Sequence, residues 1–230
     1  MNIPGQLSSR IPINFAISQS GNQEISITIL PIFGKNEIEK NVKLTFNIEC
    51  FDAWANMEYN SNLYQYESPE IKISKPIPIL KKIESLAMDV PYILDKKWKE
   101  GETLTDVKKI RQKLTRTYLE LGNIIQNQQF DSFKEMLKNR EKTMATSMYL
   151  STQESENRIK RLILDFQNGF NVFSVAKEAA VVYSAYGKKA ALKKLNGEPA
   201  LTFSNIETKE ELMLDLEFYL PKNSEEFHII

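Results

Sequence analysis

The stretch of sequence that decides the fold is residues 179–230, which read AAVVYSAYGKKAALKKLNGEPALTFSNIETKEELMLDLEFYLPKNSEEFHII. Turn-forming residues at Gly187, Asn196-Gly197 and Pro221 divide it into short apolar segments. The clearest segment runs from Leu212 to Leu220, where large apolar side chains alternate with other residues, as in a half-buried strand. The stretch therefore predicts an antiparallel meander with one apolar face that another layer must cover.

Three helices are predicted immediately before the meander, and they supply that layer. Apolar residues recur there at three- and four-residue spacing, and Ser, Thr or Asp stands near each predicted start. The predicted spans are 103–126, 130–148 and 151–169. Helices followed by an antiparallel meander predict an α+β roll, in which the helices pack on the concave side of a curved sheet.

The first hundred residues are predicted to be mostly β. Alternating apolar side chains, separated by Gly, Asn and Pro turns, indicate short strands in a small antiparallel sandwich. The segments predicted as strands are 11–17, 25–29, 42–48, 63–66, 71–73 and 94–99, and a helical turn is predicted at 79–88. We therefore predict two domains, a β-sandwich-like domain at 1–101 and the helix-and-meander domain at 102–230.

Composition limits the classes of function. Of the 230 residues, 42% are hydrophobic and 26% charged, which suits a soluble globular protein. The net charge is zero, which argues against nucleic acid as the main partner. The single cysteine, Cys50, fits a reducing compartment. We find no signal-peptide pattern and no apolar run long enough for a membrane span, so we expect a cytoplasmic location.

The second half of the chain resembles the nuclear transport factor two-like, or cystatin-like cone, fold. The stretch YLELGNIIQNQQFDSF at 118–133 looks like that family's opening pair of helices, and GKKAALKKLNGEPAL at 187–201 looks like its central hairpin. The fold serves isomerases, dehydratases, binding modules and toxin-neutralising proteins, so the resemblance implies no single function. The whole chain, rich in Asn and Lys and without an active-site motif, is also similar to bacterial toxin-immunity proteins.

No residue pattern predicts a catalytic, cofactor or metal site. The only histidine, His228, is interpreted as a surface strand residue, and one His with one Cys cannot build a zinc site without several carboxylates. Asp165 is interpreted as a solvated helix-end side chain. Arg140 lies on the apolar side of its predicted helix, so it is either buried and paired or, more commonly for arginine, extended from the edge of the apolar stripe. We therefore expect a non-enzyme that needs no cofactor.

Two features predict a protein partner. The segment 205–230 holds seven acidic residues against two lysines, whereas four lysines make 188–194 basic; an acidic surface would match a toxin with a basic surface. The tract 50–66 is aromatic and has no basic residue, as interface centres often are, although such side chains also fill cores. The candidate partner-binding residues are Trp54, Tyr59, Tyr64, Tyr66, Asp215, Glu217, Tyr219, Glu225 and Glu226.

Three hypotheses for function follow. The first is a cytosolic protein-binding module, an immunity protein that occludes the active site of a secreted bacterial toxin. The second is a small-molecule-binding or lyase/isomerase domain that uses Tyr183, Tyr186 and a carboxylate in the cone cavity; a cavity filled with Leu, Phe and Met side chains counts against it. The third is a structural subunit of a bacterial or phage assembly. Apolar and aromatic residues also alternate with polar ones on the open face of the predicted sheet, and this pattern allows a homodimer.

Overall fold

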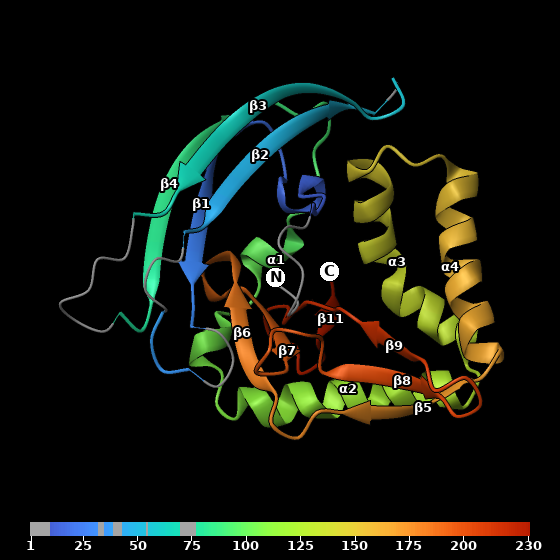
Figure 1. Cartoon of the computed structure of the whole chain (residues 1–230). Helices are drawn as coiled ribbons and strands as arrows, with labels where there is room; N and C mark the ends of the chain where they lie inside the picture. The colour runs from blue at the N-terminus through green and yellow to red at the C-terminus, as the bar shows by residue number, and fades with distance from the viewer. Residues whose placement is uncertain (1–9, 32–34, 39–42, 54, 70–76) are drawn as a thin grey trace. The chain divides into compact units, whose positions relative to one another are not determined.

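The computed structural model describes the chain except residues 1–9, 32–34, 39–42, 54 and 70–76 (Figure 1). The chain divides into two compact units: unit 2 is Gln19–Pro91, and unit 1 consists of the residues up to Ser18 and those from Tyr92 onward. Unit 2 is therefore an insertion in the sequence of unit 1. Helices and antiparallel sheets together confirm the predicted α+β class.

Unit 1 contains three long helices in the predicted order. They are α2 (Ile110–Gln126), α3 (Phe130–Ser147) and α4 (Thr152–Gln167). Ser151 starts α4 with a capping box, in which its hydroxyl accepts from the N–H of Glu154 and the Glu154 carboxylate accepts from the N–H of Ser151. The shorter elements are α1 (Lys97–Glu100) and the 3-10 turns η1 (Asn14–Ala16), η2 (Leu104–Asp106) and η3 (Ala185–Gly187). Within the described residues, no helix combines the length and apolarity that a bilayer crossing requires.

The strands of unit 1 form two antiparallel sheets. The first has the order β5-β8-β9 and the second the order β11-β10-β7-β6. Their bounds are β5 Phe170–Val175, β6 Ala180–Ser184, β7 Lys189–Lys193, β8 Leu201–Asn205, β9 Glu211–Leu214, β10 Phe218–Tyr219 and β11 His228–Ile229. The sheets meet at Ala200, whose N–H donates to the carbonyl of Leu192 and whose carbonyl accepts from the N–H of Ala176.

The single strand predicted from Leu212 to Leu220 is wrong, because the segment forms two strands in different sheets. Strand β9 pairs with β8, β10 pairs with β7 and β11, and residues 215–217 carry the chain across. The alternation of burial nevertheless continues through the crossing, with Leu216 and Phe218 both buried. Both sheets contribute to one core. Every second side chain of the segment therefore faces that core, although β9 and β10 form their hydrogen bonds with different strands.

The core of unit 1 fills the space between α2 and the two sheets. The ring of Phe166 lies between those of Phe133 and Phe203, with centroid distances of 5.7 and 4.8 Å. The side chains that are almost completely buried there are Leu114, Tyr118, Leu121, Phe133, Leu137, Leu192, Leu201, Phe203 and Phe218. The interior next to α2 is therefore occupied by aliphatic and aromatic side chains.

Unit 2 contains two antiparallel strand pairs. Strand β1 (Gly21–Ile29) pairs with β4 (Leu80–Met88), and β2 (Thr45–Asp52) pairs with β3 (Glu58–Glu67). The helical turn predicted at 79–88 is wrong, because β4 pairs with β1 along its whole length and this pairing outweighs the local helical spacing. Ser20 closes the base of the pair, since its hydroxyl accepts from the N–H of Val90 and donates to Asp89.

The division between the units differs from the predicted boundary at 101. The Tyr92 hydroxyl donates to the carbonyl of Asn14, and the N–H of Leu94 donates to that of Ser18, which ties residues 10–18 to unit 1. The strands predicted at 11–17 and 94–99 are wrong, because these segments hold η1 and α1. The strand predicted at 71–73 lies outside the described residues, as does Val42 of the strand predicted at 42–48.

Thr202 on β8 is a polar residue inside the core. It is 5% exposed, and no group among the described residues bonds its hydroxyl. Because an unpaired buried hydroxyl is unfavourable and valine has the same shape, Thr202→Val is expected to raise the free energy of unfolding by about 1 kcal/mol. Urea denaturation measures the change. Thr202→Ser, which keeps the hydroxyl and loses the methyl group, is expected to have the opposite sign; a destabilised Thr202→Val would contradict the unpaired hydroxyl.

Candidate functional site

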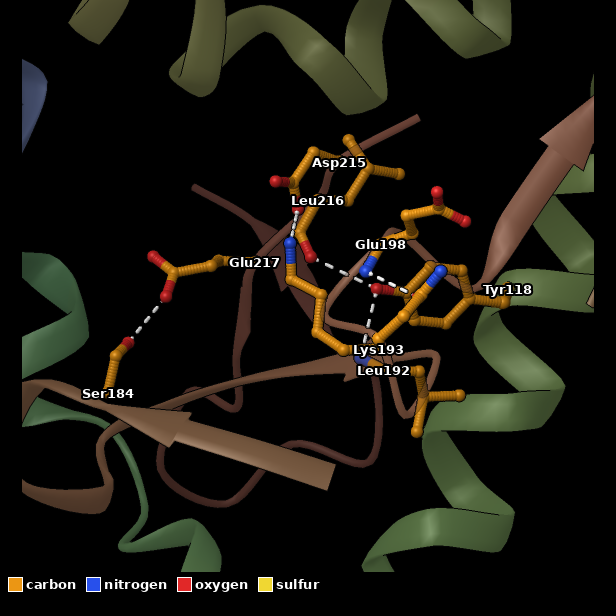
Figure 2. A network of polar contacts seen from close by, with 9 residues as sticks. Tyr118, Ser184, Leu192, Lys193, Glu198, Asp215, Leu216 and Glu217 are labelled. Atoms are coloured by element: carbon orange, nitrogen blue, oxygen red, sulfur yellow. Dashed lines mark hydrogen bonds and ion pairs between the residues drawn. The ribbon is translucent and has the colours of Figure 1, made fainter. Parts of the chain in front are cut away.

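The acidic and basic stretches that are separate in the sequence come together on the β7–β10 sheet. Lys193 of β7 forms an ion pair with Asp215. Lys189 Nζ lies 3.6 Å from Oε2 of Glu217, whose Oε1 accepts a hydrogen bond from the Ser184 hydroxyl at 2.5 Å. Figure 2 shows Lys193 and Asp215 pointing toward one another, with Ser184 and Glu217 beside them. The predicted segregation of charge is therefore cancelled by local pairing at these residues.

The two lysines of this network are sheltered from solvent. Both side chains are 17% exposed, and the Nζ atom of Lys189 lies 4.8 Å from the ring centroid of Trp98 in α1. Such a cation–π contact adds to the ion pair with Glu217. Asp215 and Glu217 were predicted to contact a partner, yet both already have cationic partners within unit 1. Their first role in this structure is to hold the crossing segment 215–217 on β7.

Tyr118 of α2 fixes the other side of the same segment. Its buried hydroxyl donates to the carbonyl of Leu216 at 3.0 Å and accepts from the N–H of Leu192 at 3.2 Å (Figure 2). Burial raises the pKa of this phenol well above its ordinary value, and the nearby Asp215 and Glu217 carboxylates raise it further. Tyr118 is therefore a neutral link between α2, β7 and the crossing segment.

Alkaline pH is expected to destabilise the fold through its buried tyrosines. Burial raises the pKa of Tyr92 to about 12 and that of Tyr118 as well, whereas an unfolded tyrosine titrates near about 10. The native state therefore keeps protons that the unfolded state releases. The contribution of these two tyrosines to stability is constant below pH ~10 and falls as the pH rises toward and beyond ~12. Urea midpoints from pH 8 to 12 measure this. The fall should be shallower in Tyr118→Phe; equal slopes would contradict the assignment.

The remaining candidates in unit 1 differ in accessibility. Tyr219 is 5% exposed, because its ring packs beside Gly101 and lies 5.6 Å from the His228 ring. The prediction that Tyr219 contacts a partner is therefore wrong, because its side chain is buried within unit 1. Glu225 and Glu226 are exposed in the loop before β11, as predicted for surface acids. His228 is exposed on an edge strand, in line with its interpretation as a surface residue.

Two polar residues of the helices, Arg140 and Asp165, were also considered in the sequence. Arg140 does not simply extend into water: its Nη1 lies 2.6 Å from Oε1 of the buried Glu141, whose Oε2 also contacts Arg158 of α4. This triad joins α3 to α4; Glu141 is buried, whereas the Arg158 side chain is 44% exposed. Asp165 is exposed near the end of α4, as expected.

The candidate residues of unit 2 divide into packed and exposed ones. Tyr64 and Tyr66 are half-buried, and the Tyr64 ring makes an edge contact with Phe46 of β2. Tyr59 is 58% exposed, and its ring lies 5.9 Å from that of Phe51. Trp54 lies outside the described residues. Among the described aromatic candidates of unit 2, Tyr59 is therefore the one that is exposed.

Tyr59 belongs to a surface that we call the hairpin tip, which consists of the described residues 51–53 and 55–59 around the β2–β3 turn. Met57 is 62% exposed there, and Asp52 stands directly opposite Glu58 in the β2–β3 register. Asn56 and Met57 both have left-handed backbones, with φ of 53° and 60°. Like charges in register and non-glycine left-handed residues are each unfavourable, so the tip shows apolar and acidic groups at a local cost in stability.

A depression of about 300 Å³, at the lower end of the volumes of ligand pockets, lies at the ends of α2 and α4. It is lined by Ile125, Gln126, Gln128, Phe166, Gln167 and Asn171. Tyr183 and Tyr186, the residues expected in a cone cavity, are 39% and 80% exposed. Over the described ranges, no three His, Cys, Asp or Glu side chains are placed to hold a metal ion together.

Comparisons with known proteins found no matching family model, no matching curated protein and no matching solved structure.

Proposed function

We propose that this protein is a non-catalytic binding module that recognises a protein with a basic surface through the hairpin tip. In particular, we propose that it is an immunity protein that occludes the active site of a secreted bacterial toxin. The observation that carries the proposal is the tip itself, where the exposed side chains of Met57 and Tyr59 flank the facing carboxylates of Asp52 and Glu58.

The chemistry of the tip fits a cationic partner. Residues 50–66 contain no basic side chain, so the field of Asp52 and Glu58 is not neutralised by a cation of that segment. The Asp52 carboxylate already accepts from the N–H of Ala55 at 3.1 Å, and a lysine or arginine of the partner beside Asp52 and Glu58 would add a charge-assisted contact. Exposed Met and Tyr side chains supply the apolar anchors that dominate binding energy at interface centres. Toxins that act on nucleic acid must carry such basic surfaces.

The filled interior of unit 1 also supports recognition on a surface over chemistry in a cavity. The side chains between α2 and the sheets are aliphatic and aromatic, and they are almost completely buried. Binding a substrate there would require these side chains to move apart. The order of three helices before antiparallel strands supports the proposed likeness to the nuclear transport factor two-like fold, which includes binding modules.

The test is co-expression with the toxin encoded next to its gene, followed by affinity measurement on the purified pair. Wild-type protein is expected to restore growth. Tyr59→Ala is expected to weaken binding by about 30-fold, the effect of a truncated aromatic anchor worth ~2 kcal/mol. Glu58→Lys should weaken it at least tenfold, because it places a cation against a basic surface.

The matched control is Asp165→Lys, which makes the same charge change at an exposed acid of α4 that is not a candidate partner-binding residue. Its affinity should stay within about threefold of wild type, since only the long-range field changes. Circular dichroism must show that each variant is folded. If folded Tyr59→Ala and Glu58→Lys protect and bind as well as wild type, the hairpin tip does not recognise the toxin. A wild-type protein that neither binds nor protects would contradict the immunity function.

A further inference from the structure

Strand β6 has an open and neutral edge. It pairs with β7 on one side only, and no described residue makes a backbone hydrogen bond to its other side. From Ala179 to Gly187 the sequence reads AAVVYSAYG, without a charged residue or proline. Val182 is 47% and Tyr183 39% exposed. Proteins normally protect a free edge with charges, prolines or bulges, because exposed strand edges pair with other strands.

The other edges in unit 1 carry such protection. Strand β9 contains Glu211, and β5 has a bulge between Phe170 and Val172. Strand β11 is two residues long, too short to template another strand. Strand β6 keeps an unbroken register with β7 over all five residues. The unprotected edge is therefore particular to β6 within residues 92–230.

The turn that follows β6 displays another apolar group beside this edge. Ala185, Tyr186 and Gly187 all have positive φ, of 49°, 56° and 77°. This left-handed path is unfavourable for the first two residues, and it leaves Tyr186 80% exposed. Tyr186 therefore extends the neutral surface of Val182 and Tyr183 beyond the end of the strand.

We propose that β6 pairs with β6 of a second copy of this chain, in a two-fold symmetric antiparallel dimer centred on Val182. In that register Val182 faces Val182, Val181 faces Tyr183, and Ala180 faces Ser184. Opposed β-branched and aromatic residues stabilise a strand pair, and no like charges meet.

The sequence of β6 favours a second copy over a strand of a different protein. When β6 pairs with β6 of a second copy, each residue of the strand faces a neutral residue. No other protein with a matching strand sequence is then required. The interface is small, because the strands are five residues long. Contacts well below about 1,200 Å² are typically weak and transient, so we expect half-dissociation at tens of micromolar, to order of magnitude.

The first test measures the mass of the full chain by sedimentation equilibrium from about 1 to 500 µM, a range that brackets the expected dissociation. Wild type is expected to shift from monomer to dimer. Val182→Lys should weaken dimerisation at least tenfold, because it places two cations face to face. The control is Val172→Lys on β5, a valine of similar exposure on a different edge, which should dimerise like wild type.

The second test reads the register by disulfide formation in a Cys50→Ser background. Val182→Cys should form a covalent dimer under mild oxidation, because directly opposed Cα atoms lie within about 4.5–5.5 Å. Ala180→Cys and Ser184→Cys should not, since each would lie about four residues, or ~13 Å, from its own copy.

A monomer at every concentration overturns the proposal, and so does cross-linking at 180 or 184 that equals that at 182. A monomer whose toxin binding is lost in Val182→Lys would assign the edge to that partner instead. The dimer is measured without any toxin, so its failure is distinct from failure of the proposed function.

Discussion

Replacing Tyr118 with phenylalanine is expected to lower the free energy of unfolding by about 2–4 kcal/mol, a large effect for the loss of one oxygen atom. The hydroxyl serves two buried backbone groups, the N–H of Leu192 and the carbonyl of Leu216. Phenylalanine keeps the ring contact with Phe218, whose centroid is 5.1 Å away, so the packing term changes little. The loss therefore comes from two backbone groups left without a partner in the core. Chemical denaturation of both proteins gives the difference.

Tyr92→Phe is the matched control. That hydroxyl also bonds a backbone carbonyl, of Asn14, but it serves a single group. A loss of about 1 kcal/mol is expected there, the usual net contribution of one hydrogen bond. If Tyr118→Phe costs no more than Tyr92→Phe, then another group or a water molecule replaces the Tyr118 hydroxyl, and its linking role is contradicted.

Replacing Gly122 with alanine is expected to lower the free energy of unfolding by about 2–3 kcal/mol. The same change in an exposed helix raises stability by ~1 kcal/mol, because alanine is the better helix former. Gly122 is different because a β-carbon there would lie 2.3 Å from ring atoms of Phe173 on β5. The added methyl group must push α2 away from β5 or force the ring from its position, and either change disturbs a close-packed core.

A double-mutant cycle with Phe173→Leu tests this cause. Leucine removes most of the ring that the new methyl group meets, so alanine at 122 should cost much less in that background and its helix propensity should become visible. Asn123→Ala, at the adjacent exposed position of α2, is expected to be neutral or slightly stabilising. Equal losses from Gly122→Ala in both backgrounds would show that contact with Phe173 is not the reason.

Local signals in the sequence predicted much of unit 1. Helix α4 is an example, since Ser151 and Glu154 build its start and Asn168-Gly169 follows its end, all within the segment itself. The segment 94–99 shows the limit of such signals. Its side chains alternate like a strand, but the Asp95 carboxylate accepts from the N–H of Lys97 and the chain turns into α1. A short-range hydrogen bond thus overrides a hydrophobic pattern.

The candidate sites were harder to predict because their contacts are long-range. Lys193 and Asp215 are 22 residues apart, and Tyr118 is 98 residues from Leu216. Nothing in the local pattern of either partner shows the other, so the acidic and basic stretches looked like separate surfaces. The tract 50–66 was recognisable from its composition alone. Only the register of β2 with β3 shows that Asp52 faces Glu58.

The insertion of unit 2 sets an order on synthesis by the ribosome. The strand pairing described in unit 2 lies within residues 19–91, so β1 and β4 can join as soon as position 88 leaves the exit tunnel. Unit 1 must wait for its far end, because Phe227 and Ile229 belong to its core and the N–H of Ile230 bonds the carbonyl of Glu217. A nascent chain therefore holds the hairpin tip in a paired strand segment while the three long helices still lack their last partners. In a stalled or shortened chain, the apolar side chains of unit 1 would stay exposed and chaperones would bind them. The hairpin tip in unit 2 would already have formed.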